Sequence, residues 1–140
     1  MTQITKLKTG SLFEDMASYS RLVAVDHWIH VSNMAGLTPQ SQLIADDVIE
    51  QNHQVFANIE TALAAVDASL EDVICSRVFV QRPEDVPAVM EVLGTTFRGI
   101  DPATTITCPP LGSTVYKVEL EVTAYRGASR ADVKLIRLGQ

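Results

Sequence analysis

The stretch YKVELEVTAY, residues 116–125, alternates strictly between two kinds of side chain, and this alternation limits the folds open to the chain. Successive side chains of a β-strand point to opposite faces of the sheet. One face here is apolar, whereas the other carries Lys117, Glu119, Glu121 and Thr123. We therefore expect a strand that covers a core on one side and faces water or a neighbouring subunit on the other.

The clearest helix is predicted between residues 41 and 69. Its apolar side chains recur every three or four residues, which is the spacing of one helical face. The positions on this face are Ala45, Val48, Asn52, Phe56, Ile59, Leu63 and Val66. Asp46 and Asp47 fall near the start, where acidic side chains suit the helix dipole. This face can pack on the apolar side of the alternating strand.

The remaining elements follow from β-rich runs and the residues that interrupt them. In chain order we expect a strand at 3–10, a loop with a helical turn at 11–20, a hairpin of strands 22–25 and 28–32, the long helix, a strand at 71–81, a second helix at 83–99, two strands around a turn within 101–122, and at 131–138 a last short strand or a packed tail. Asp26 and His27 would turn the hairpin, while Pro83 and Gly99 suit the start and end of the second helix. Each helix thus lies between strands, which predicts an α+β fold with a mixed sheet and both helices on one face. The length of the chain predicts a single domain over residues 1–140.

Composition argues against several classes of function. The net charge of −6, without any run of Lys or Arg, disfavours a nucleic-acid partner. No signal peptide is visible, and no run approaches about 18 apolar residues, so no membrane segment is expected. Cys75 and Cys108 are too few for a disulfide scaffold, and we expect buried thiols in a reducing cytoplasm. His27, His30 and His53 form no metal motif, so no metal site is predicted.

Three stretches, taken in their order and spacing, resemble the RidA (YjgF) family of enamine/imine deaminases. They are YSRLVAVDHWIHVS at 19–32, NIETALAAVDASLEDVICSRVFV at 58–80, and PATTIT at 102–107 followed by YKVELEV at 116–122. The resemblance implies a chorismate-mutase-like fold assembled as a homotrimer, whose sheets curve into a central barrel and whose ligand clefts lie between subunits. It also implies hydrolysis of 2-aminoacrylate and related enamines or imines to a 2-keto acid and ammonia, without a cofactor.

The resemblance carries site residues over by position. Glu119 matches the family's catalytic glutamate, Tyr19 an early tyrosine, and Ser32 a serine at the end of the third strand. A water held by Glu119 and by a backbone carbonyl near Ile106 would attack the imine carbon. The positions implied to bind substrate are Tyr19, Ser32, Asn33, Thr104, Thr105 and Ile106. Asn33 departs from the family, which usually has glycine after the serine.

A second departure is larger, because the family's deaminases read Pro-Ala-Arg where this chain reads Pro102-Ala103-Thr104. That arginine holds the substrate carboxylate, and threonine offers one neutral hydroxyl instead of a charged two-pronged donor. We therefore predict that the usual amino-acid-derived imine is not the best substrate. Arg21 and Arg77 are possible substitutes, although an ordinary salt bridge is the favoured interpretation of each.

Two classes of function remain open from sequence. The first is an enamine/imine deaminase or related hydrolase that acts on a small metabolite in clefts between trimer subunits. The second is a non-catalytic trimer that binds a small metabolite. By spacing alone, Glu119 and Glu121 fit a solvated strand face, and Glu121 is favoured as structural, paired with Lys117 or Arg126.

Overall fold

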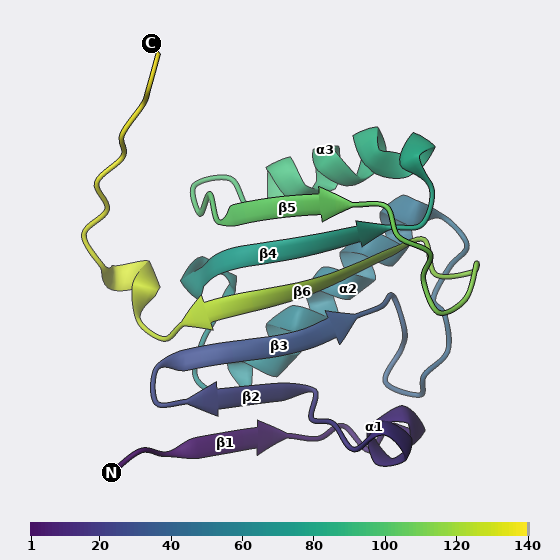
Figure 1. Cartoon of the computed structure of the whole chain (residues 1–140), viewed down its shortest axis with the longest axis horizontal. Coiled ribbons are helices and arrows are strands. Elements are labelled where there is room, and N and C mark those ends of the chain that lie inside the picture. Colours follow the sequence, from purple (N-terminus) through teal and green to yellow (C-terminus); the bar gives the residue numbers. More distant parts are fainter. Residues whose placement is uncertain (140) are drawn as a thin grey trace.

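The computed structural model describes residues 1–139, and its main feature is one mixed sheet in the order β1-β2-β3-β6-β4-β5. The strands are β1 (Ile4–Leu7), β2 (Leu22–Val25), β3 (Trp28–Met34), β4 (Val73–Val80), β5 (Ala103–Thr107) and β6 (Val118–Tyr125). Neighbouring strands are antiparallel except β4 and β5, which run parallel. Figure 1 shows the long helices α2 (Val48–Ala64) and α3 (Val86–Thr96) together behind the sheet. The predicted α+β fold with both helices on one face is confirmed.

The shorter helices lie at turns of the chain. They are α1 (Leu12–Ala17) and the single 3-10 turns η1 (Leu70–Asp72), η2 (Pro83–Asp85) and η3 (Ala128–Arg130). Ser11 caps α1 by accepting a hydrogen bond from the backbone N–H of Phe13, and Ser18 ends the helix in a left-handed conformation. The helical turn expected within residues 11–20 is therefore α1.

The core lies between the sheet and the two long helices. β6 supplies Val118, Leu120, Val122 and Ala124, none of which is more than 3% exposed. These side chains are the apolar half of the alternation in the sequence, and their burial confirms the predicted orientation of the strand. The packed face of α2 includes Asn52, Phe56, Ile59 and Leu63, as its spacing predicts, and Val55 is buried beside them.

The helix α2 begins at Val48, later than predicted, because Asp47 caps it. The backbone of Asp47 is extended, and its side chain accepts a 3.0 Å hydrogen bond from the N–H of Glu50. Before this cap the chain forms a loop, in which Leu37 and Leu43 are joined by an isolated bridge. This loop forms one wall of the pocket that contains Glu119.

The two strands predicted around a turn within residues 101–122 are β5 and β6, but they are not neighbours in the sheet. β4 separates β5 from β6, so Thr105 pairs with Arg77, and Arg77 in turn pairs with Glu121. The reason is the connection through α3, which returns the chain parallel to β4 on its outer side. Residues 108–117 then cross back so that β6 can fill the space between β3 and β4.

Residues 131–138 form neither a strand nor a packed tail, so both alternatives predicted for them were wrong. Gly127 and η3 turn the chain away from β6, whose two neighbours are already β3 and β4. The segment then extends from the body (Figure 1), and its four large apolar side chains are at least 66% exposed. Cys108 was also predicted wrongly, because it lies exposed just after β5.

Candidate active site

An irregularity in β3 creates the site. Between Val31 and Met34 the register with β6 shifts, so that three steps along β3 match only two steps along β6, from Val122 to Leu120. Such a bulge turns an additional side chain out of the regular alternation. Val31 and Met34 both face the core, and the two residues between them, Ser32 and Asn33, are directed elsewhere.

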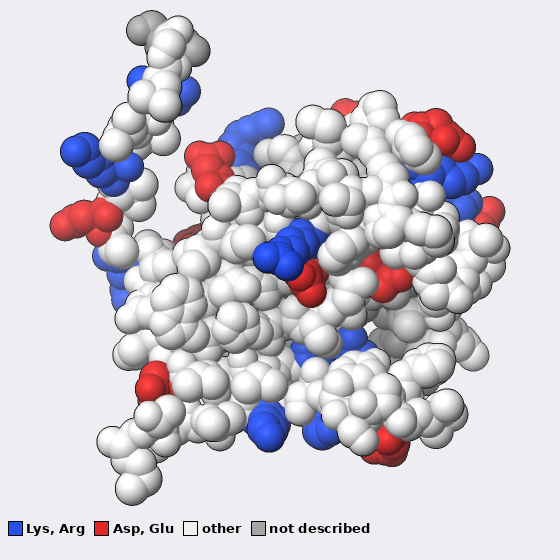
Figure 2. All heavy atoms as spheres, viewed as in Figure 1, with Lys and Arg blue, Asp and Glu red and all other residues white. Residues whose placement is uncertain are grey.

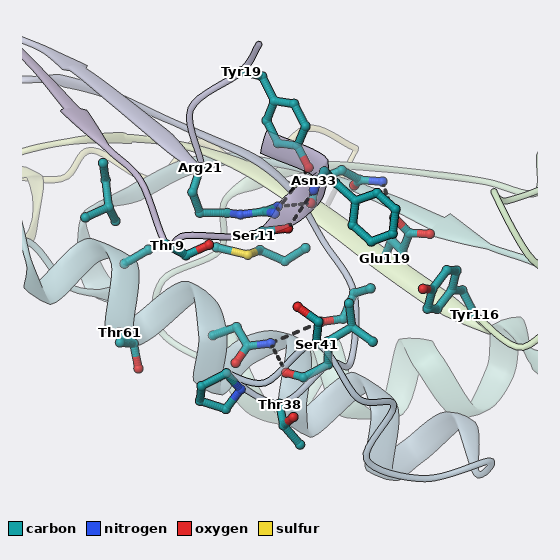
Figure 3. A pocket seen from close by; sticks show the side chains of 18 of the residues that line it. Thr9, Ser11, Tyr19, Arg21, Asn33, Thr38, Ser41, Thr61, Tyr116 and Glu119 are labelled. Atoms are coloured by element: carbon teal, nitrogen blue, oxygen red, sulfur yellow. Dashed lines mark hydrogen bonds between the residues drawn. The ribbon is translucent and has the colours of Figure 1, made fainter. Parts of the chain in front are cut away.

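Asn33 and Glu119 line a cavity of about 530 Å³ beside the bulge. The size suits a small metabolite. Figure 3 shows Tyr19, Arg21, Asn33 and Glu119 gathered along one wall, with α2 and its Thr61 across the opening. The loop before α2 contributes further side chains, among them Thr38 and Ser41. The apolar part of the lining includes Leu7, Phe13, Met34, Ala35, Leu37, Pro39, Ala62 and Ala65.

Glu119 is the acidic side chain of this cavity. It accepts a 2.8 Å hydrogen bond at Oε1 from Nδ2 of Asn33. Burial raises the pKa of Glu119, and the charge of Arg21 and the hydrogen bond from Asn33 oppose this only in part, so the pKa lies above its usual value of 4.5. A carboxylate with a raised pKa can accept and return a proton closer to neutral pH than an exposed one.

Arg21 is the basic side chain of the cavity and is only 15% exposed. Its Nε lies 3.6 Å from Oε2 of Glu14, a residue that is 1% exposed. Glu14 is in turn held by Thr9, whose backbone N–H and hydroxyl both donate to its carboxylate. Burial raises the pKa of Glu14, but these hydrogen bonds and the charges of Arg21 and Lys8 outweigh it, so the pKa is lowered. Glu14 therefore remains ionised and fixes the guanidinium.

The residues expected to bind substrate divide into two groups in this single chain. Tyr19 and Asn33 line the cavity with Glu119. Ser32 lies behind Arg21, because its Oγ donates to the Arg21 carbonyl over 3.1 Å and lies 3.4 Å from Nη1 of the same residue. Ser32 faces a second hollow of about 410 Å³ on the sheet face without the long helices.

Thr104, Thr105 and Ile106 lie on β5, the edge strand, and do not line the cavity that contains Glu119. The hydroxyl of Thr104 lies 2.7 Å from Oγ of Ser76 and 3.0 Å from the carbonyl oxygen of Pro102. Within one chain, β4 stands between these three residues and β6. Their part in a site therefore depends on association with another subunit, which stays a prediction.

Glu121 and Arg77 form a separate pair on the sheet face without the long helices. Arg77 Nη1 lies 3.6 Å from Glu121 Oε1, and the two side chains are 66% and 37% exposed. The structural role predicted for Glu121 fits this contact, but Arg77 takes the place of the predicted Lys117 or Arg126. Lys117 instead lies 3.1 Å from Asp46. Figure 2 shows this face as mostly uncharged, with a small group of acidic and basic atoms near its middle.

Neither a metal site nor a membrane-spanning helix is found within residues 1–139. No group of three His, Cys, Asp or Glu side chains there is placed to hold a metal ion. None of the helices in the same range is long and apolar enough to cross a membrane.

The sequence reasoning missed Glu14, Thr9 and Tyr116 as parts of the cavity region. Glu14 lies in a six-residue helix, too short for periodicity to show that its side chain is buried. Tyr116 belongs to the alternating stretch and was assigned to the core, but it lies before the start of β6 and lines the cavity. The available signal for Glu14 was its place, with Phe13, in the short acidic-aromatic stretch before YSR at 19–21.

Fold and cavity together define a small α+β protein with a metabolite-sized pocket that pairs one carboxylate with one guanidinium. The family model described as Endoribonuclease L-PSP matches residues 9–126. The chain therefore belongs to this family, that of the RidA (YjgF) proteins.

Relatives within the family include proteins named as imine deaminases. The 2-iminobutanoate/2-iminopropanoate deaminase of Mus musculus is 33% identical over 113 residues, which are 78% of this chain and 82% of that protein. The protein of the same name from Homo sapiens is 29% identical over 113 residues, or 78% and 80% of the two chains.

Solved structures agree with the fold. A member of the YjgF/YER057c/UK114 family from Mycobacterium tuberculosis superimposes with a TM-score of 0.80 at 30% identity, covering 88% of this chain and 99% of that one. Yeast Mmf1 superimposes with a TM-score of 0.78 at 22% identity, covering 89% and 99%, and shows the likeness of fold alone.

Proposed function

We propose that the protein is an enamine/imine deaminase or a related hydrolase that acts on a small metabolite. The observation that carries the proposal is Glu119, a partly buried carboxylate with a raised pKa in a metabolite-sized cavity. The relatives named as 2-iminobutanoate/2-iminopropanoate deaminases support the same reaction class. No cofactor is required, because water adds directly across a polarised C=N bond.

Glu119 is the proposed general base. It takes a proton from a water molecule while the oxygen of that water bonds to the imine carbon. The proton then passes to the imine nitrogen, which gives a carbinolamine. Glu119 next transfers the hydroxyl proton of the carbinolamine to its amino nitrogen, so that the C–N bond breaks as the C=O bond forms and ammonia leaves. Asn33 holds the carboxylate in one orientation through its 2.8 Å hydrogen bond, and Tyr19 bounds the cavity beside it.

A homotrimer is part of the proposal, because the site residues on β5 can approach Glu119 only from another subunit. An apolar row crosses the sheet face without the long helices, through the cross-strand partners Ile4, Val25, Trp28 and Tyr125. Ile4, Trp28 and Tyr125 are 60%, 46% and 37% exposed in the single chain. Exposed apolar rows of this kind mark surfaces that another protein covers. Thr104, Thr105 and Ile106 of one subunit would then complete the cavity of the next.

We also propose the cytoplasm as the compartment, because Cys75 and Cys108 are both free. Free thiols persist in a reducing environment.

Turnover of imines made in place tests the function. An amino-acid oxidase converts 2-aminobutanoate to 2-iminobutanoate, and semicarbazide traps whatever imine has not been hydrolysed. We expect the protein to lower the trapped fraction for at least one member of a panel of imines. A folded protein that leaves every trapped fraction unchanged would contradict the proposal.

A non-catalytic binding protein is the second candidate, and Thr104 favours it. Threonine carries no charge, so position 104 offers no cation for a substrate carboxylate. The hydroxyl of Thr104 is also already engaged by Ser76 and by the carbonyl oxygen of Pro102. Binding of a keto acid without turnover of any imine would support this candidate. RNA cleavage, which the family description names, is the outcome we expect least, because the chain carries a net charge of −6.

A further inference from the structure

We infer that Arg21 binds the carboxylate of the substrate and so replaces the arginine that position 104 lacks. The inference rests on the proposed function and names its substrate class, an imine or enamine that carries a carboxylate. It departs from the expectation, drawn from position 104 alone, that amino-acid-derived imines are disfavoured. It also separates two candidates that the sequence left open, because Arg21 lines the cavity that contains Glu119, whereas Arg77 lines the separate hollow that contains Glu121.

Arg21 is in the right place for this role. Its side chain lines the same cavity as Glu119 (Figure 3), and its positive charge acts on the Glu119 carboxylate. A ligand between the two would place its carboxylate at Arg21 and its C=N carbon toward Glu119. Arg77, by contrast, is 66% exposed and is paired with Glu121 outside this cavity.

The guanidinium is held before any ligand arrives. Nη1 donates to the carbonyl oxygen of Asn33 over 2.8 Å, and Nη2 lies 3.4 Å from the hydroxyl of Tyr19. The Tyr19 ring lies beneath the guanidinium carbon at 5.5 Å, and Glu14 faces Nε. A donor fixed in this way loses little conformational freedom when it binds a ligand.

The guanidinium also retains hydrogen-bonding capacity. Arginine has five N–H donors, and the hydrogen bonds to described residues occupy Nη1 twice and Nη2 once. One N–H of Nη2 therefore has no partner among residues 1–139. A carboxylate is the ligand best suited to it, because a hydrogen bond between charged partners is about twice as strong as one between neutral groups.

Charge balance gives the inference a second consequence. Glu14 already offsets the charge of Arg21, and Glu119 is the next carboxylate in the cavity. A bound carboxylate would add negative charge and screen Arg21 from Glu119, and both effects favour the protonated form of Glu119. Binding of a carboxylate ligand should therefore raise the pKa of Glu119 further, with partial uptake of a proton at pH values near that pKa, while Glu119 stays ionised and able to act as a base at higher pH.

The test compares two stable probes of one shape, 2-oxobutanoate and its neutral amide 2-oxobutanamide, by titration calorimetry on the full chain. We expect the protein to prefer the carboxylate by roughly 10- to 150-fold, the range for a charged hydrogen bond. Arg21→Gln should reduce this preference to near unity, whereas Arg77→Gln should keep it. Because Arg21→Gln leaves Glu14 without its cation, the double variant Glu14→Gln/Arg21→Gln is measured beside it.

Proton uptake distinguishes ligand binding from a merely structural role of Arg21. Repeating the titration in buffers with different ionisation enthalpies should show uptake with 2-oxobutanoate, none with the amide, and none in Glu119→Gln. Equal binding of the two probes, absence of binding, or a preference that persists in folded Arg21 variants would overturn the inference.

The inference and the proposed function fail separately. If the protein hydrolyses imines but shows no carboxylate preference, only the inference fails. If it hydrolyses no imine but binds 2-oxobutanoate through Arg21, only the proposed function fails.

Discussion

Asn33 and Glu119 are 86 residues apart in the chain, yet the side-chain amide of Asn33 donates a 2.8 Å hydrogen bond to the Glu119 carboxylate. The contact joins the bulged end of β3 to the start of β6. It favours the ionised form of Glu119 and so opposes the effect of burial on its pKa. The balance between these two effects sets the pH at which Glu119 can act as a base.

Replacing Asn33 should therefore change the pH dependence of the reaction. As a base, Glu119 must be ionised, so kcat/KM should fall as the pH drops through its raised pKa. Asn33→Leu removes a donor to the carboxylate, which should raise that pKa further and move the acid limb of the profile to higher pH. Thr123→Val is the matched control, because Thr123 lies on the same strand as Glu119 and its hydroxyl is near His30 and not near the Glu119 carboxylate. An acid limb that stays in place in Asn33→Leu would contradict this role.

Glu14 should make the fold sensitive to acid. Its pKa is lowered in the folded protein, so the stability that it contributes is present above its usual value of 4.5 and is lost as the pH falls through the lower, folded-state value. Urea unfolding at a series of pH values measures this loss. Glu14→Gln should show a shallower fall in the free energy of unfolding over that acidic window. Identical slopes for the two proteins would contradict the assignment.

Gln51 should stabilise the region that carries the cavity. It is fully buried, its Nε2 donates to the carbonyl oxygens of Ala45 and Val115, and its Oε1 accepts from the N–H of Lys117. Gln51→Leu leaves these three backbone groups without their partner, at a cost of about 1–3 kcal/mol for a buried unsatisfied group. Chemical denaturation should show this loss, and Gln40→Ala in the exposed loop should change stability by less than about 0.5 kcal/mol.

The assembly can be tested on the apolar row that includes Trp28 and Tyr125. Light scattering after size exclusion should give about three chain masses for the unmodified protein. Trp28→Glu places a charge in that row and should reduce the mass toward that of a monomer, because an unpaired charge is costly to bury. The exposed tail offers a control, since Leu138→Glu should leave the mass unchanged. A monomeric parent protein at micromolar concentration would contradict the shared cleft.

Much of the fold was predictable because its signals are local. The alternation of residues 116–125 and the apolar face of α2 each follow from neighbours a few positions away. The strand order was not predictable in the same way. The placement of β4 between β5 and β6 depends on how the connection through α3 returns the chain, and no side-chain pattern records it.

The candidate site was predictable only in part. Glu119 and Tyr19 came from the family resemblance, and the structure places both in one cavity. The contact of Asn33 depends on the bulge in β3, and the sequence reasoning ended that strand at Ser32. The fixing of Arg21 depends on Glu14, which accepts hydrogen bonds from Thr9 five residues earlier and lies beside Arg21, and no periodicity of its short helix indicates these contacts.

The most direct test of the account compares Glu119→Gln with Glu121→Gln, two identical substitutions two residues apart on β6. Hydrolysis of the best imine substrate is measured for both variants, together with melting temperature and assembly state. Loss of a general base should lower kcat by about 10²- to 10⁴-fold in Glu119→Gln. Glu121→Gln, which disturbs only an exposed pair with Arg77, should retain most of its activity, and both variants should stay folded. Equal losses in the two variants, or a loss in Glu119→Gln that follows unfolding, would contradict the catalytic role of Glu119.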